Sequence, residues 1–88
     1  MKEDNQLIWK SVGDLIKLGS VKTFPEIFHI VRKSNVARRV GINNVRFSKL
    51  INKPRGFKLE DIDIMAGLFF VKPMDILRLI YGPPGPAE

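Results

Sequence analysis

The sequence contains no cysteine, a single histidine and no long uncharged apolar run. Without cysteine, the chain of 88 residues forms neither a disulfide framework nor a thiolate metal site, and a reducing compartment is the default for such a composition. The first ten residues, MKEDNQLIWK, carry acids and amides where a signal peptide needs an apolar stretch. These absences favour a soluble cytoplasmic protein without a membrane-spanning segment.

Signatures of catalysis are also missing. The sequence has no Gly-rich phosphate loop and no nucleophile elbow. Its densest acidic cluster, Glu60, Asp61 and Asp63, stands at the start of a predicted helix, where the helix dipole accounts for the negative charge. His29 has no cysteine to share a zinc ion with. We therefore expect no enzyme activity, no cofactor, no metal ion and no small-molecule ligand.

Positive charge is concentrated in one segment that has no acidic residue. Between Ile27 and Leu59 the sequence has nine basic side chains, namely Arg32, Lys33, Arg38, Arg39, Arg46, Lys49, Lys53, Arg55 and Lys58. The rest of the chain carries six basic residues against nine acidic ones, so the positive net charge of the chain, +6, arises from this segment alone. Such an asymmetry is the footprint of a surface that binds a polyanion. Charge alone leaves open a solvated basic face or an anionic-membrane patch.

Apolar spacing predicts helices and no strands. The pattern indicates helices over residues 5–18, 24–31, 33–40, 44–52, 59–69 and 73–80. Residues 23–26, TFPE, match a capping box, Gly41 is suited to end a helix in the left-handed conformation, and Asn43 is suited to cap the next one. Gly82 and the two prolines after it end the last helix. The predicted fold class is all-α, a compact bundle of five to six helices.

The core of this bundle is predicted from the apolar face of each helix. In the first helix this face consists of Leu7, Ile8, Ser11, Val12, Leu15 and Leu18, with Asp4 or Asn5 as the cap. In the later helices it consists of Val36, Ala37, Val40, Phe47, Leu50, Ile51, Leu59, Ile62, Ala66, Phe69 and Leu77. We divide the chain into an N-terminal helix extension (1–22), a main domain (23–81) and a disordered Pro/Gly tail (82–88).

Residues 35–52, NVARRVGINNVRFSKLIN, combine two short helices with a glycine turn. This is the helix-turn-helix pattern, in which the second helix enters the major groove of DNA. Ala37 is small where the two helices cross, and Gly41 supplies the turn. Ile42, Phe47 and Leu50 are apolar and anchor the second helix, so its polar side chains are left outside.

The same stretch resembles the lambda-repressor-like (Cro and XRE type) helix-turn-helix family. The resemblance runs through VARRVGINNVRFSKLIN and the following KLEDIDIMAGLFFVKPMDIL, and it covers residues 24–80. It implies a lambda-repressor-like bundle that binds double-stranded DNA sequence-specifically through the major groove, as a small transcriptional regulator associated with the nucleoid. The additional N-terminal helix departs from the family pattern.

The resemblance also implies a role for particular residues. Asn44, Val45 and Lys49 fall where the family reads base edges, although Val45 replaces the more common polar residue. Lys33 falls where the family usually has a glutamine that contacts phosphate, and lysine changes that contact to a point charge. Basic residues that flank the reading helix are suited to positioning contacts. The predicted contacts to the DNA backbone are Arg32, Lys33, Asn43, Arg46, Ser48, Asn52, Lys53 and Arg55.

Several of these residues also have a simpler explanation. Arg46, like Arg38 and Arg39, is also consistent with a solvated helix position. Asn43 is first a helix cap, and Asn52 is equally consistent with the end of its helix.

Other functions and partners are left open by the sequence. One alternative is an antitoxin-like or other protein-interaction module that uses the same helical fold, because fold alone does not decide function. RNA binding is weaker, since the aromatic residues fall mostly on apolar faces. A homodimer is open, through Trp9 and the first helix or through Leu79, Ile80 and Tyr81.

Overall fold

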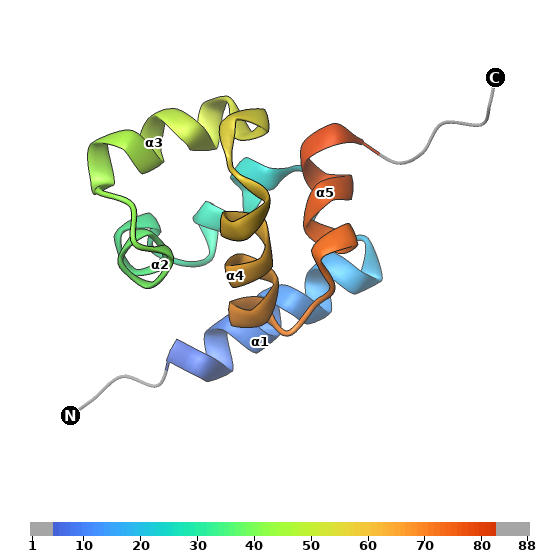
Figure 1. Cartoon of the computed structure of the whole chain (residues 1–88). Coiled ribbons are helices and arrows are strands. Elements are labelled where there is room, and N and C mark those ends of the chain that lie inside the picture. The colour runs from blue at the N-terminus through green and yellow to red at the C-terminus, as the bar shows by residue number, and fades with distance from the viewer. Residues whose placement is uncertain (1–4, 83–88) are drawn as a thin grey trace, which may run out of the picture.

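The computed structural model describes residues 5–82, and every regular element in this range is helical (Figure 1). The elements in chain order are α1 (Asn5–Leu18), η1 (Phe24–His29), α2 (Lys33–Val40), α3 (Asn44–Asn52), η2 (Pro54–Gly56), α4 (Leu59–Phe69) and α5 (Pro73–Tyr81), where η denotes a 3₁₀ helix. The predicted all-α fold class is confirmed. Asp4, a predicted cap, and residues 83–88 of the predicted tail lie outside the described residues.

Helix α4 lies at the centre of the bundle (Figure 1). It packs against α1, α2 and α5, while α3 packs against α2, η1 and η2. Helix α3 therefore lies at the edge of the molecule, where one of its sides faces solvent.

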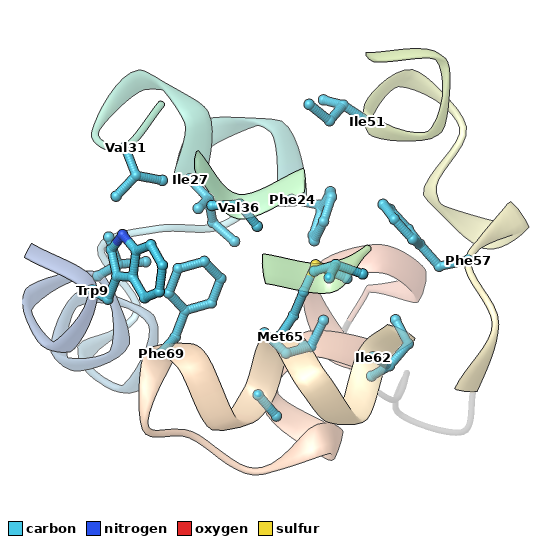
Figure 2. Packing of buried hydrophobic residues seen from close by; sticks show 14 of the residues in the cluster. Trp9, Phe24, Ile27, Val31, Val36, Ile51, Phe57, Ile62, Met65 and Phe69 are labelled. Carbon is cyan, nitrogen blue, oxygen red and sulfur yellow. The ribbon is translucent and has the colours of Figure 1, made fainter. Parts of the chain in front are cut away.

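A continuous apolar core joins η1 and all five α-helices, α1 included (Figure 2). Trp9 of α1 packs edge-to-face against Phe69 of α4, with ring centroids 6.3 Å apart. Towards the other end of the core, the rings of Phe24 and Phe57 pack edge-to-face, with centroids 5.4 Å apart (Figure 2). The predicted inward residues of α2, Val36, Ala37 and Val40, are buried, and so are Phe47, Ile51, Ile62, Ala66 and Phe69.

The predicted apolar face of α1 was wrong in part: Val12 is buried and Leu15 packs against the core, but three other residues do not. Leu7, Ile8 and Leu18 are exposed by 67%, 45% and 77%, although the prediction assigned them to the core. The buried side of α1 consists of Trp9, Val12, Gly13 and Ile16. These four positions have helical spacing, but a glycine at one of them hides the pattern from a search for apolar side chains.

Two further details differ from the sequence prediction. Leu59, predicted in the core, is the first residue of α4 and is 72% exposed, so the packed part of this helix begins at Ile62. The predicted helix through Val31 is a 3₁₀ segment that ends at His29. Leu50 and Leu77 are half-buried against the core.

Acidic residues cap three of the elements in the same way. Oε1 of Glu26 accepts hydrogen bonds from the backbone N–H groups of Lys22 (2.7 Å) and Thr23 (3.4 Å) at the start of η1. A carboxylate at the third position likewise accepts the N–H before α4 (Asp61 Oδ2, 3.1 Å) and before α5 (Asp75 Oδ2, 3.0 Å). These carboxylates satisfy backbone donors that have no partner inside the helix.

Candidate nucleic-acid interface

Three residues, Gly41, Ile42 and Asn43, connect α2 to α3. Gly41 has φ 89° and ψ 27°, in the left-handed region that glycine adopts without steric cost. The carbonyl oxygen of Ala37 accepts hydrogen bonds from the N–H groups of Gly41 (2.8 Å) and Ile42 (3.0 Å). Because Ile42 is buried directly after the turn, the direction in which α3 leaves α2 is determined by packing as well as by the backbone.

Four phenylalanine rings, one of them on α3 itself, pack together on the inner side of this helix. Phe47 of α3 packs edge-to-face against Phe28 and Phe57, and both of these rings pack in the same way against Phe24. The centroid distances lie between 5.4 and 5.6 Å, so the rings form a closed cycle across η1, α3 and the end of η2. Edge-to-face aromatic pairs add stabilisation beyond the area that they bury. The cycle therefore holds the inner face of α3 rigidly against η1.

The outer face of the first half of α3 presents polar and apolar side chains around a shallow hollow. The hollow is lined by Asn43, Asn44, Val45, Arg46 and Lys49, all of which are exposed. Asn43 caps the helix, since its Oδ1 accepts a hydrogen bond of 2.8 Å from the N–H of Arg46. Val45 is 69% exposed, so it adds an apolar side chain to this surface. The surface thus offers an amide, an ammonium group, a guanidinium group and an apolar contact side by side.

A second hollow lies between η1 and the other side of α3. Its polar lining consists of Lys33 from the start of α2, Ser48 and Asn52 from α3, and His29 from the end of η1. Asn52 Nδ2 lies 3.5 Å from the carbonyl oxygen of Ser48, one helical turn earlier. Three predicted backbone contacts, Lys33, Ser48 and Asn52, are therefore brought together by the fold.

The remaining predicted residues are more dispersed. Arg32 precedes α2 and Lys53 follows α3, and both are exposed. Arg55 on η2 places its guanidinium 4.7 Å from the centroid of the Tyr81 ring on α5. Arg55 is thus directed towards α5, and the structure groups it with neither hollow.

The basic side chains of this surface are not neutralised by acidic partners. Within residues 5–82 the structure contains an ion pair between Arg78 and Asp75 (3.7 Å) and no other. Arg39 instead stacks on an aromatic ring, with its guanidinium 5.1 Å from the Trp9 centroid. Since the segment from Ile27 to Leu59 contains no acidic residue, its positive charge faces solvent uncompensated.

No acidic side chain lines either hollow. The backbone hydrogen bond from Lys22 is the main cause that lowers the pKa of Glu26, and nearby Lys22 and His29 act in the same direction.

No group of three or more His, Asp or Glu side chains among the described residues is arranged to hold a metal ion. No described helix has the length and apolar character needed to cross a membrane.

Sequence reasoning missed one residue of this surface, His29. The sequence predicts no role for it beyond a weak zinc ligand, whereas the structure places it in the second hollow with Lys33. The available signal was its position four residues before Lys33, in the same basic segment.

A search against family models found no match to the chain, and searches of curated proteins and of solved structures found no similar protein.

Proposed function

We propose that this protein binds double-stranded DNA sequence-specifically and acts as a small transcriptional regulator. In this proposal α2, the Gly41 turn and α3 form a lambda-repressor-like helix-turn-helix, with α3 in the major groove. The observation that carries it is the outer face of α3. An anchored helix presents exposed Asn44, Val45 and Lys49 beside uncompensated positive charge.

The chemistry of these three residues suits base edges. An asparagine amide pairs bidentately with adenine, a lysine ammonium donates to guanine, and a valine methyl contacts the methyl group of thymine. All three side chains line the same hollow in the first two turns of α3, which is where a major-groove helix meets the bases. Asn44, Val45 and Lys49 are therefore the proposed base-reading residues.

The surrounding residues suit the phosphate backbone. Lys33, Ser48 and Asn52 line one hollow, whereas Asn43 and Arg46 lie at the start of α3. Arg32, Lys53 and Arg55 add exposed positive charge before and after these helices. Phosphate contacts supply most of the affinity and fix the register, while base contacts provide the discrimination.

The experiment that tests this proposal is the selection of bound duplexes from a random DNA pool at near-physiological salt, followed by sequencing. The expected result is an enriched motif. If the protein binds as a homodimer, the motif has two related half-sites about one helical turn apart, on the order of 34 Å. The Asn44→Ala/Lys49→Ala double variant is the matched control, and it should lose the enrichment while keeping its fold.

Absence of enrichment, with retention of DNA only at low salt, would contradict the proposal and leave a nonspecific basic surface.

A protein-interaction module of the antitoxin kind is the second candidate function. It is favoured by an apolar hollow on α5, which is lined by Met74, Leu77, Arg78, Tyr81 and Gly82. Met74 and Tyr81 are exposed by 57% and 53% there. Trp9, by contrast, is buried in the core, so it offers no surface for a dimer.

A further inference from the structure

We propose that the hollow around His29 is a pH-dependent seat for a phosphate of the DNA backbone. This inference rests on the proposed function and adds a regulatory property to the same surface. It follows from the juxtaposition of His29 at the end of η1 with Lys33 of α2 and with Ser48 and Asn52 of α3.

The lining of this hollow matches the chemistry of a phosphodiester. Pro25, Phe28 and Ile51 make its apolar part, and its polar groups are the four side chains named above. Each of these four groups can donate a hydrogen bond, and none is acidic. A phosphodiester carries one negative charge and offers only acceptor oxygens, so a set of donors without a carboxylate favours it.

The position of the hollow suits a backbone contact. Ser48 lies next to the proposed base-reading Lys49, and Asn52 lies one turn further along α3. When a helix enters the major groove, the phosphates run along its flanks. A phosphate beside α3 would therefore meet the His29 hollow while Asn44 and Lys49 face the bases.

Charged groups of both signs lie near His29. Lys33 is the cation that shares the hollow, and Glu26 is the carboxylate on the same 3₁₀ segment, where it is bonded to the backbone of Lys22 and Thr23. Two helices pack against η1. Helix α5 carries Asp75 and Arg78, which pair with each other, and helix α3 carries Arg46 and Lys49, which line the other hollow. Among the side chains that line the hollow, histidine is the type that generally changes charge between about pH 5 and pH 8, and His29 is the histidine there.

Protonation of His29 would place a second positive charge in the hollow beside Lys33. Imidazole side chains generally change charge between about pH 5 and pH 8, so DNA affinity should rise as the pH falls through this range. His29 is exposed, so a phosphate can reach its ring from solvent. It is also the sole histidine of the chain, which means that a pH effect removed by its substitution has one source.

The test is the affinity for the selected duplex at about pH 5.5 and pH 8, over a series of salt concentrations. The wild type should bind about three- to tenfold more tightly at the lower pH, and its logarithmic salt slope should steepen by about one. His29→Gln keeps a hydrogen-bond donor but cannot become charged, so its affinity should not change with pH. Lys33→Gln is the matched control, because it should weaken binding at both pH values and retain the pH dependence.

The outcomes separate this inference from the proposed function. Sequence-specific binding with equal affinity at both pH values, or a pH dependence that persists in His29→Gln, overturns the inference and leaves the proposed function standing. Failure to bind any duplex at either pH overturns both. The ring C2–H resonance of His29 gives a second readout by NMR. Its titration should move to higher pH when the selected duplex is added, and a movement caused equally by inorganic phosphate would contradict a seat for the DNA backbone.

Discussion

The backbone of α1 at Gly13 lies directly against the carbonyl oxygen of Phe69, at the turn between α4 and α5. A Cβ atom at position 13 would collide with this oxygen and would also come within 3.2 Å of Cγ1 of Val71. The glycine is therefore not a weak point of the helix but the place where two backbones meet. Its contact explains why α1 packs with the side that contains Trp9, Val12 and Ile16.

Gly13→Ala should destabilise the protein, because the obstacle is a backbone atom and not the end of a flexible side chain. We expect a loss of about 1–3 kcal/mol in the free energy of unfolding, or a melting temperature about 10 °C lower. Thermal unfolding followed by circular dichroism measures the change. Gly67→Ala is the matched control, since Gly67 lies in α4 with open space around its Cβ position. Helix propensity should make this variant about 0.5–1 kcal/mol more stable. Equal melting of Gly13→Ala and wild type would contradict the packing of α1 described above.

Gly41→Ala should lower stability for a different reason. Nothing lies within 4 Å of a Cβ atom at position 41, so the cost comes from the backbone, which has φ +89°. An L-residue in the left-handed region costs about 1–2 kcal/mol. Gly41→Asn should cost less, because asparagine tolerates this conformation better. Urea unfolding of the two variants would reveal the order, and a Gly41→Ala protein as stable as Gly67→Ala would be inconsistent with a left-handed turn.

Several helix ends could be predicted from the sequence because each of them has a local signal. Gly41, Asn43 and Gly82 stand where the structure has them at a turn, a cap and a helix end. The buried side of α1 could not be predicted in the same way. Gly13 has no side chain that would indicate a buried contact. Leu7 is a large apolar residue, which predicts burial, but it is 67% exposed.

The candidate site likewise has one part that the sequence predicts and one part that it does not. The exposed position of Asn44, Val45 and Lys49 follows from the apolar anchor Phe47 on the same helix, so periodicity alone predicts it. The His29 hollow depends on how η1 meets α3, and that contact is made by aromatic rings distant in sequence. No local pattern encodes such a contact.

Glu26 should make stability depend on pH in the acidic range. Its folded-state pKa is lowered, chiefly by the backbone hydrogen bond from Lys22, so the carboxylate stabilises the folded state above the ordinary glutamate range. This contribution is lost as the pH falls through the lowered folded-state pKa. Glu26→Gln removes the titrating group but keeps an acceptor oxygen. The difference in melting temperature between wild type and this variant should shrink between about pH 6 and pH 2, and a constant difference would argue against the cap.

Base-reading and backbone residues should differ in how their loss affects specificity. Lys49→Ala removes a donor that faces the bases in the proposed complex, so it should lower affinity for the selected duplex by about 1–3 kcal/mol and leave a scrambled duplex less affected. Lys53→Ala removes an exposed charge after α3, so it should weaken both duplexes alike and reduce the logarithmic salt slope by about one. Lys17→Ala on α1 removes the same charge outside the basic segment and should change neither. Fluorescence anisotropy with both duplexes over a salt series makes the comparison. Equal losses of Lys49→Ala and Lys53→Ala on both duplexes would mean that α3 contributes charge alone, because a residue that reads bases must distinguish between the two sequences.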